Sequence, residues 1–399
     1  MSSAAAPVTT VLRADRLVTG ERGTVIPGGC LVVRDDVIQW VGPADTLPAE
    51  RCEGAVIVDL PGVTLLPGLI EAHTHLSLDG GPRPFEVLAS ADDEAILDGM
   101  RGNARRMLAA GITTGRDLGA PRHLEHRLAA EIARGATAGP TLSTSGIPLT
   151  VPGGHLDMMG GACTDEPDID ALIAENREFG ATWTKVVVTG GFLTGGTSPY
   201  RSQLPPGYLK TAVALSHERG MRVAVHVHGT EGVREAVAAG VDTIEHCTWM
   251  TEDGFDLDPA LLGEMAAAGV AVSVTVNSRA RLAAGALPWR ERRSHLDRMV
   301  GAGVRIAVGT DSGIGMTAHD DLPRSLDNYR DLDLSCLGVI ELATGGTARA
   351  LGLEHTVGSL AAGLRADVIG VQGDPLTDLQ TLAAPCYVMA AGRTYKAGD

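Results

Sequence analysis

Two histidines that follow an apolar segment are the first residues in the chain that could carry out chemistry. Residues 65–78 read LLPGLIEAHTHLSL, with Pro67 and Gly68 interrupting the apolar run shortly before His73 and His75. Because side chains alternate faces along a strand, the two imidazoles are expected to point the same way. Such a pair can bind one divalent metal ion, although a His-x-His pair also occurs on ordinary surface strands. The rest of the chain has to decide between these interpretations.

Further ionisable residues interrupt apolar segments elsewhere in the chain. Taken singly, each has an ordinary explanation: His226 and His228 could be satisfied core histidines, Lys185 could reach solvent, and Asp311 could cap the following turn. Chance rarely places so many such residues at strand ends, and a lysine inside an apolar strand requires a chemical reason. Histidine and aspartate are ligands for Zn²⁺ or a similar ion, and CO₂ can convert a lysine amine into a carbamate that behaves as a carboxylate. The pattern therefore favours a metal site.

The order of apolar and amphipathic segments predicts the scaffold that would bring these residues together. The middle of the chain contains eight units of strand followed by helix, with helices expected near 92–110, 121–134, 168–179, 206–219, 230–239, 258–268, 290–302 and 320–331. Eight such units predict an α/β fold with a closed (β/α)₈ TIM barrel, in which catalytic groups lie at the C-terminal ends of the strands. An open doubly wound sheet is the alternative, but no Gly-x-Gly-x-x-Gly segment follows an early strand.

Particular strand ends should therefore carry the functional groups. We expect strand 4 to contain Lys185, and the ends of strands 1, 5, 6 and 8 to carry His73 with His75, His226 with His228, His246, and Asp311, respectively.

The two ends of the chain differ from the middle in their pattern of apolar and turn-forming residues. Residues 8–66 and 357–399 consist of short apolar strands separated by turns, without helix-length periodicity. Because chain termini commonly lie near each other, we expect residues 1–66 and 357–399 to form one small β-sandwich-like domain. Residues 67–356 would then form the barrel.

The composition of the chain narrows the binding partners and the cellular compartment that we expect for the protein. A net charge of −16 argues against nucleic acid or an anionic membrane as a partner. Six cysteines without Cys-x-x-Cys spacing argue against a thiolate zinc site and for a reducing compartment. The sequence shows no signal peptide and no 18-residue apolar run. We therefore expect a cytoplasmic protein.

The segments HTH, TKVVVTGG, VHVHG, DTIEH and GTDSG, with the tail SLAAGLRADVIGVQGDPL, together resemble the amidohydrolase superfamily. The similarity is greatest to the branch that contains prolidase-like Xaa-amino-acid dipeptidases, arginine carboxypeptidase-like enzymes and ochratoxin-hydrolysing amidases. This resemblance implies two divalent metal ions, with Zn²⁺ as the expected ion. One would be bound by His73, His75 and Asp311, the other by His226 and His246, and a carbamate on Lys185 would bridge them.

The resemblance also bears on residues that would contact substrate. The family pattern makes the first histidine of VHVHG the ligand, so we expect His228 to face the substrate. His155, preceded by two glycines, resembles a pocket segment of this branch. The loop after strand 4 carries Tyr200 and Arg201 and departs from the familiar dipeptidase patterns, so for both residues a surface position is an equal alternative.

The expected activity is hydrolysis of an amide bond in a dipeptide or N-acyl amino acid. A hydroxide that bridges the two metals would attack, and Asp311 would act first as general base and then as general acid. We expect a small-molecule amide substrate and a homo-oligomer. A deaminase or imidazolone-type hydrolase on the same barrel is the alternative. Such enzymes typically use a glutamate shortly after the strand-5 histidine. Here Glu231 lies five residues after His226 and at the start of a helix, which weakens this alternative. A non-catalytic assembly protein is disfavoured by the complete ligand set.

Overall fold

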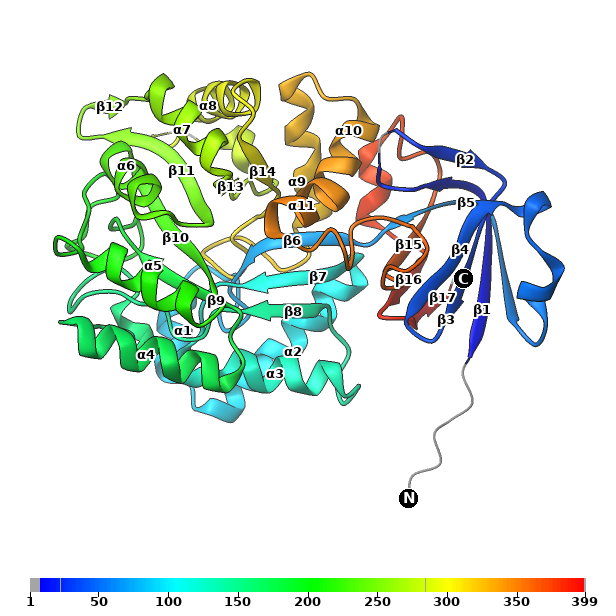
Figure 1. The fold of residues 1–399 in the computed structure, drawn as a ribbon, viewed down its shortest axis with the longest axis horizontal. Helices are drawn as coiled ribbons and strands as arrows, with labels where there is room; N and C mark the ends of the chain where they lie inside the picture. Colours follow the sequence, from blue (N-terminus) through cyan, green and yellow to red (C-terminus); the bar gives the residue numbers. More distant parts are fainter. Residues whose placement is uncertain (1–7, 22, 284, 398–399) are drawn as a thin grey trace.

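The computed structural model describes residues 8–21, 23–283 and 285–397, which form three β-sheets flanked by helices. A sheet of short strands occupies one end of the molecule, and two largely parallel sheets with most of the helices occupy the other (Figure 1). Strands and helices alternate along the chain through this second part. The fold is therefore α/β, as the sequence predicts.

The sheet at one end combines strands from both ends of the chain. Its strand order is β17-β16-β15-β5-β1-β3-β4, with β2 paired to β1, and β5 pairs antiparallel with β15. Leu12, Leu17, Leu31, Leu65 and Tyr387 are buried together in its core. The bounds of its strands are β1 (Thr9–Val18), β2 (Val25–Pro27), β3 (Gly29–Arg34), β4 (Val37–Pro43), β5 (Val56–Pro67), β15 (Val368–Gln372), β16 (Tyr387–Ala390) and β17 (Arg393–Ala397).

The strands of the second part pair in parallel. One sheet contains β6 (Leu69–Thr74), β7 (Ile112–Asp117) and β8 (Thr141–Thr144). The other contains β9 (Trp183–Val187), β10 (Arg222–Gly229), β11 (Thr243–Thr251), β13 (Ala271–Ser273) and β14 (Arg305–Ala307), with β12 (Gly254–Phe255) as a short antiparallel addition to β11. Single parallel bridges join β9 (Val186) to Leu149 in the segment after β8, and β6 (Thr74) to Ser312 in the segment after β14. The strands are covered on both faces, which explains their nearly continuous apolar sequences.

The helices follow the parallel strands close to the predicted positions. They are α2 (Asp93–Ala109), α3 (Leu124–Ala133), α4 (Glu166–Phe179), α5 (Tyr208–Glu218), α6 (Thr230–Ala239), α7 (Pro259–Ala268) and α8 (Trp289–Gly301). A short helix that the sequence did not predict, α1 (Pro84–Ser90), precedes α2. Among the helices that the structure describes, none is both long enough and apolar enough to cross a bilayer.

The helix expected at 320–331 differs from the prediction. It is divided into a short α9 (Leu322–Ser325) and a 3₁₀ segment, Leu326–Leu332. Asp321 precedes α9, but its carboxylate accepts hydrogen bonds from the backbone and hydroxyl of Ser278 rather than capping the helix. Two helices that the sequence did not predict follow: α10 (Cys336–Glu341) and α11 (Thr347–Leu351), joined by a π-helical turn.

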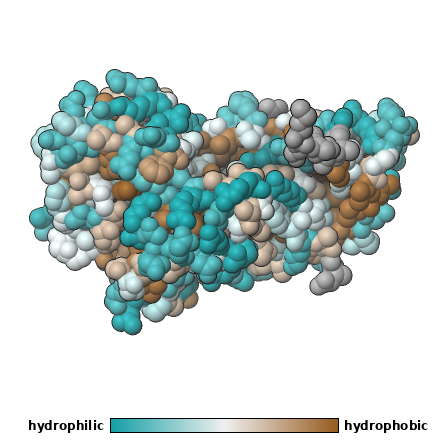
Figure 2. Space-filling view, turned by 90° about the horizontal axis from the view of Figure 1, so that it is seen from below, coloured by the Kyte–Doolittle hydropathy of each residue, from teal (hydrophilic) through white to brown (hydrophobic). Residues whose placement is uncertain are grey.

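The surface is predominantly hydrophilic on the face shown in Figure 2, and hydrophobic residues gather at the end formed by the eight-stranded sheet. In strand β5 of this sheet, Val56 and Ile57 are 56% and 46% exposed. This end therefore exposes more apolar surface than the neighbouring regions of the same face.

Candidate metal centre

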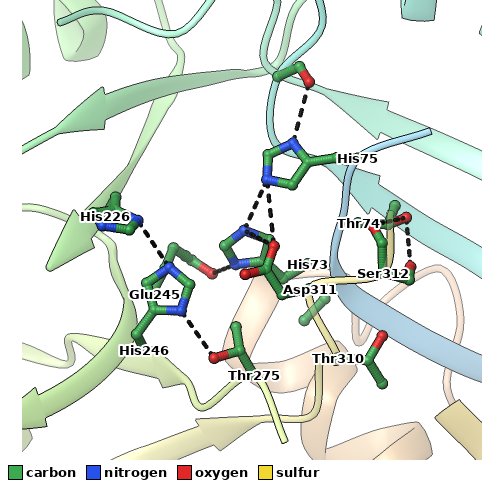
Figure 3. A network of polar contacts seen from close by, with 12 residues as sticks. His73, Thr74, His75, His226, Glu245, His246, Thr275, Thr310, Asp311 and Ser312 are labelled. Atoms are coloured by element: carbon green, nitrogen blue, oxygen red, sulfur yellow. Dashed lines mark hydrogen bonds and ion pairs between the residues drawn. The ribbon is translucent and has the colours of Figure 1, made fainter. Parts of the chain in front are cut away.

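Two groups of metal-ligand side chains lie close together on the parallel strands or in the segments that follow them (Figure 3). One group consists of His73, His75 and Asp311, the other of His226, His228 and His246. Within each group, one ligand atom per residue lies within 4.8 Å of the others. The structure thus brings together residues that are far apart in the sequence and that the sequence singled out, while their roles remain predictions.

The first group has the spacing that a single ion requires. Nε2 of His73 lies 3.3 Å from Nε2 of His75, and these two atoms lie 3.4 and 3.5 Å from Oδ1 of Asp311. Ligands about 2.0–2.1 Å from a tetrahedral zinc ion are ~3.4 Å apart. Oδ1 of Asp311 is buried and has no hydrogen-bond partner among the described residues. A divalent cation would satisfy this oxygen.

Hydrogen bonds orient both histidines of the first group. Nδ1 of His73 lies 2.9 Å from Oε2 of Glu245, and Nδ1 of His75 lies 3.2 Å from the carbonyl oxygen of Gly119. When each Nδ1 donates to its oxygen, the lone pair of Nε2 points towards Asp311 and can bind a metal. Burial lowers the pKa of His75 to about 3 and that of His73 well below its usual value. Both imidazoles are therefore neutral, which is the metal-binding form.

The second group contains one histidine more than the sequence assigned to it. Nδ1 of His226 lies 2.9 Å from Nε2 of His246, whose Nδ1 is 2.9 Å from the hydroxyl of Thr275. The His228 ring stacks on that of His246 at 4.5 Å, and its Nδ1 lies 3.1 Å from the Thr248 hydroxyl. His228 thus lies beside the expected ligands, and its predicted substrate-facing role needs a direct test.

Lys185 lies in β9 and lines the same cavity as the residues of these two groups. Its side chain is 1% exposed, and Nζ has no hydrogen-bond partner among the described residues. Burial lowers the pKa of Lys185, whereas the nearby Glu245 and Asp311 raise it. A buried ammonium without a hydrogen-bond acceptor is unfavourable. A carbamate would replace the ammonium with a carboxylate-like anion, and bound cations would compensate its charge and supply the missing contact.

Comparison with known proteins agrees with this donor set. Residues 64–395 match the Amidohydrolase family. The chain belongs to this family. Ochratoxinase of Aspergillus niger is 24% identical over 97% of this chain and 86% of its own length. Imidazolonepropionase of Anaeromyxobacter sp. (strain K) is 28% identical, covering 90% of this chain and 89% of the relative.

A solved structure extends this similarity to the fold. A Xaa-Pro dipeptidase with methionine bound in its active site matches with a TM-score of 0.84 and 25% identity, covering 97% of this chain and all of that one (100%). The resemblance to the prolidase and ochratoxinase branch is therefore confirmed. The protein is an enzyme, a hydrolase that acts on carbon–nitrogen bonds.

The backbone of this amidohydrolase departs from the predicted strand ends. The expectation that strands 6 and 8 end at His246 and Asp311 is wrong, because β11 continues to Thr251 and β14 stops at Ala307. His246 and Asp311 have φ angles of 69° and 62°, in the left-handed region that non-glycine residues rarely adopt. A register shift between β10 and β11 accompanies the bend at His246. Strain of this kind is common where side chains are aimed at a functional site.

A buried ion pair behind the metal site was not predicted from the sequence. Nη2 of Arg116 lies 2.9 and 3.0 Å from the two carboxylate oxygens of Glu245, which in turn binds Nδ1 of His73. Both charged side chains are at most 1% exposed. The available signal was a charged residue within an apolar strand: Glu245 directly precedes His246, and Arg116 lies in ITTGRD. The pair positions a ligand rather than binding metal itself.

A cavity of about 470 Å³ opens onto the metal-site residues. His155 and His228 line it, as the sequence predicted for residues near the substrate, and the rings of His155 and His226 are 4.8 Å apart. Tyr200 and Arg201 are not among the described lining residues. The guanidinium of Arg201 is 65% exposed and forms an ion pair with Glu252 at 3.0 Å. The structure therefore corresponds to the surface alternative for Arg201, whereas Tyr200 is half-buried outside the cavity lining.

The buried pair yields a stability prediction. Arg116→Met should lower the free energy of unfolding by about 3–5 kcal/mol, because it leaves the Glu245 carboxylate buried without its partner. Urea denaturation followed by circular dichroism measures the change. The control is Arg127→Met, which removes an exposed ion pair with Glu94 and should cost no more than ~1 kcal/mol. Equal losses in the two variants would contradict the role of the buried pair.

Proposed function

We propose that this amidohydrolase is a binuclear metal-dependent enzyme that cleaves the amide bond of a dipeptide or an N-acyl amino acid. The observation that carries the proposal is the spacing of 3.3–3.5 Å among ligand atoms of His73, His75 and Asp311, beside the buried, unpartnered amine of Lys185. The architecture we infer is a closed (β/α)₈ barrel at 67–356 with a small β domain from the two chain ends. The single bridges from β9 and β6 to the segments after β8 and β14 support closure.

Each ligand has a proposed place in the centre. His73, His75 and Asp311 would hold one ion, His226 and His246 would hold the other, and a carbamate on Lys185 would supply a carboxylate-like ligand to the centre. Two divalent cations held there, Zn²⁺ in the first instance, would lower the pKa of water at the site and polarise the amide carbonyl. The contact between Glu245 and His73 keeps Nε2 of this histidine free for binding.

Asp311 has the second task of moving a proton. A carboxylate that binds an ion through one oxygen retains a second oxygen for proton transfer. Asp311 would accept the proton of the attacking water and deliver it to the nitrogen of the leaving amine. Its backbone N–H donates to the carbonyl oxygen of His73 at 2.9 Å, which keeps the carboxylate beside the histidines.

The lining of the cavity favours substrates with an apolar part. Phe192, Leu193, Leu282 and Met316 line it, and their exposed fractions range from 46% to 78%. Large apolar side chains that remain exposed in this way commonly mark a binding site. An N-acyl group or an apolar amino-acid side chain could cover them.

The alternative is the cyclic-amide chemistry that the name imidazolonepropionase denotes in one relative. Related deaminase and imidazolone chemistry calls for an acidic group shortly after the strand-5 histidine. Glu231, the nearest acid after His226, is in α6 with its side chain 78% exposed, and it is not among the described cavity-lining residues. Hydrolysis of a linear amide is therefore the better-supported proposal.

Metal content and turnover test the proposed function directly. The zinc-loaded protein should contain about two ions per chain and release amino acids from a panel of dipeptides and N-acyl amino acids. His73→Ala and His226→Ala should each lower the metal content and abolish turnover, because each removes a ligand. Elemental analysis and chromatography of the products measure both quantities.

The control for this test is His355→Ala, at a side chain that is 93% exposed. It should keep both the metal and the activity. Full metal occupancy in the His73 and His226 variants would refute the ligand assignment. A fully loaded wild-type protein that cleaves no member of the panel would refute the proposed substrates.

Lys185 can be tested by chemical rescue. Lys185→Ala should lose activity, and short-chain carboxylic acids should partly restore it by occupying the vacant bridging position. The measurement is the hydrolysis rate as a function of added acetate or propionate. Lys210→Ala, at an exposed lysine of α5, should show neither the loss nor the rescue. Undiminished activity in Lys185→Ala would exclude a bridging carbamate.

His228 has two possible roles that metal analysis separates. If it faces the substrate, His228→Ala should retain about two ions per chain and lower kcat/KM by about 10–100-fold, the effect of one lost hydrogen bond to a charged group. Steady-state kinetics and elemental analysis of the same preparation provide the answer. Loss of one ion would show instead that His228 is a ligand.

A further inference from the structure

An arginine in the cavity wall is not used by the proposed metal chemistry. Arg292 belongs to α8, and its side chain lines the same cavity as the metal-site histidines. Its Nη2 donates to the carbonyl oxygens of Val274 and Thr275, the second at 3.3 Å. In the part of the chain that the structure describes, Nε and Nη1 donate to no protein atom. These donors remain available to a ligand.

The guanidinium of Arg292 also lacks an acidic partner. No ion pair joins it to a described carboxylate, in contrast to Arg281, which pairs with both Asp327 and Asp331. Asp311 is the single carboxylate among the described lining residues of the cavity. A cation left unpaired in a protein whose net charge is −16 is notable, because carboxylates are abundant elsewhere on the chain. Burial lowers the pKa of Arg292, in agreement with incomplete compensation of its charge.

Arg292 lies at a suitable place relative to the metal site. Thr275 connects the two, because its hydroxyl lies 2.9 Å from Nδ1 of His246 and its carbonyl oxygen accepts from Arg292. In an amide of an amino acid, only the amide nitrogen and the α-carbon separate the α-carboxylate from the scissile carbonyl carbon. A group that binds this carboxylate must therefore lie next to the metal site, as Arg292 does.

We propose that Arg292 binds the α-carboxylate of the amino acid that leaves, and so restricts the enzyme to amides with a free carboxylate. The inference rests on the proposed function and names the substrate class within it. A guanidinium is permanently charged and offers two parallel donors that fit a carboxylate. His228, the residue that sequence alone favours for a substrate contact, has one ring nitrogen next to the Thr248 hydroxyl and offers no such pair of donors.

A second arginine in the cavity wall is a rival. Arg279 also lines the cavity, but it is exposed, and solvent competes for its donors. Arg292 is more enclosed and adjoins the metal site. The two arginines therefore predict different outcomes when each is replaced separately.

The test compares two substrates that share the bond to be cleaved. N-acetyl-L-leucine and N-acetyl-L-leucinamide both release acetate, and they differ only in the carboxylate. The zinc-loaded wild-type enzyme should prefer the carboxylate in kcat/KM by ~30-fold or more, since a buried charged contact is lost in the amide. In Arg292→Gln this preference should nearly vanish, because the efficiency for the carboxylate falls far more than the efficiency for the amide. Arg298→Gln, on the exposed side of the same helix, is the matched control and should keep the preference.

Defined outcomes would overturn the inference. They are a wild-type enzyme without the preference, an Arg292→Gln variant that retains it, and a loss caused by Arg279→Gln instead. If Arg292→Gln does not fold, Arg292→Lys decides: it keeps a charge but loses the paired donors, so the preference should fall at least ~3-fold, and an unchanged preference would refute the proposal.

The failure of the proposed function can be told apart from the failure of this inference. If wild-type protein releases no acetate from either compound, amide hydrolysis of this class is refuted, and both compounds are then stable ligands. Calorimetric titration of each into wild type and Arg292→Gln tests the arginine alone. Tighter binding of the carboxylate only in the wild type supports the role of Arg292, and equal binding of the two compounds refutes it.

Discussion

The buried contact between Arg116 and Glu245 is the interaction on which the rest of the site depends. Nε of Arg116 donates to the carbonyl oxygen of Ala72 in β6, and its Nη2 donates to Glu245 in β11. One side chain of β7 therefore ties the three-stranded sheet to the larger parallel sheet, while its guanidinium lies 4.4 Å from the ring centre of Trp183 in β9. A charge without its partner at this depth would be strongly destabilising. The pair consequently fixes Glu245, and Glu245 fixes the ring of His73.

A second buried carboxylate, that of Glu71, holds the backbone beside His73 and Asp311. Glu71 is 1% exposed, and its Oε1 accepts from the backbone N–H groups of His73 and Thr310, at 3.1 and 2.9 Å. Its Oε2 accepts from the Thr310 hydroxyl at 2.6 Å. Asp311 follows directly, with its backbone in the left-handed region. Strain at this residue persists because the preceding residue, Thr310, is held by two hydrogen bonds that it donates to the Glu71 carboxylate.

The sequence allowed prediction of what depends on local periodicity. Helices such as α2 and α6 begin and end close to the predicted residues, and the ligand-type residues were identified because polar groups are rare in apolar strands. The continuation of β11 beyond His246 could not be predicted, since it relies on left-handed φ angles at residues other than glycine. The partners of Arg116 and Arg201 are likewise set by contacts between distant segments. Arg116 is buried behind the metal site, whereas Arg201 pairs with Glu252 at the surface.

The protein as a whole is negatively charged, but the cavity beside the metal site contains cationic side chains. A net charge of −16 repels a carboxylate-bearing substrate. This repulsion is short-ranged, because salt screens exposed charges beyond about 8 Å at physiological ionic strength. Inside the cavity the balance is reversed, because two cationic side chains, Arg279 and Arg292, line it together with one described carboxylate, Asp311. Cations bound to the histidines would add to this balance. Discrimination in favour of an anionic substrate must therefore arise after entry, where water is excluded and contacts between charges are strongest.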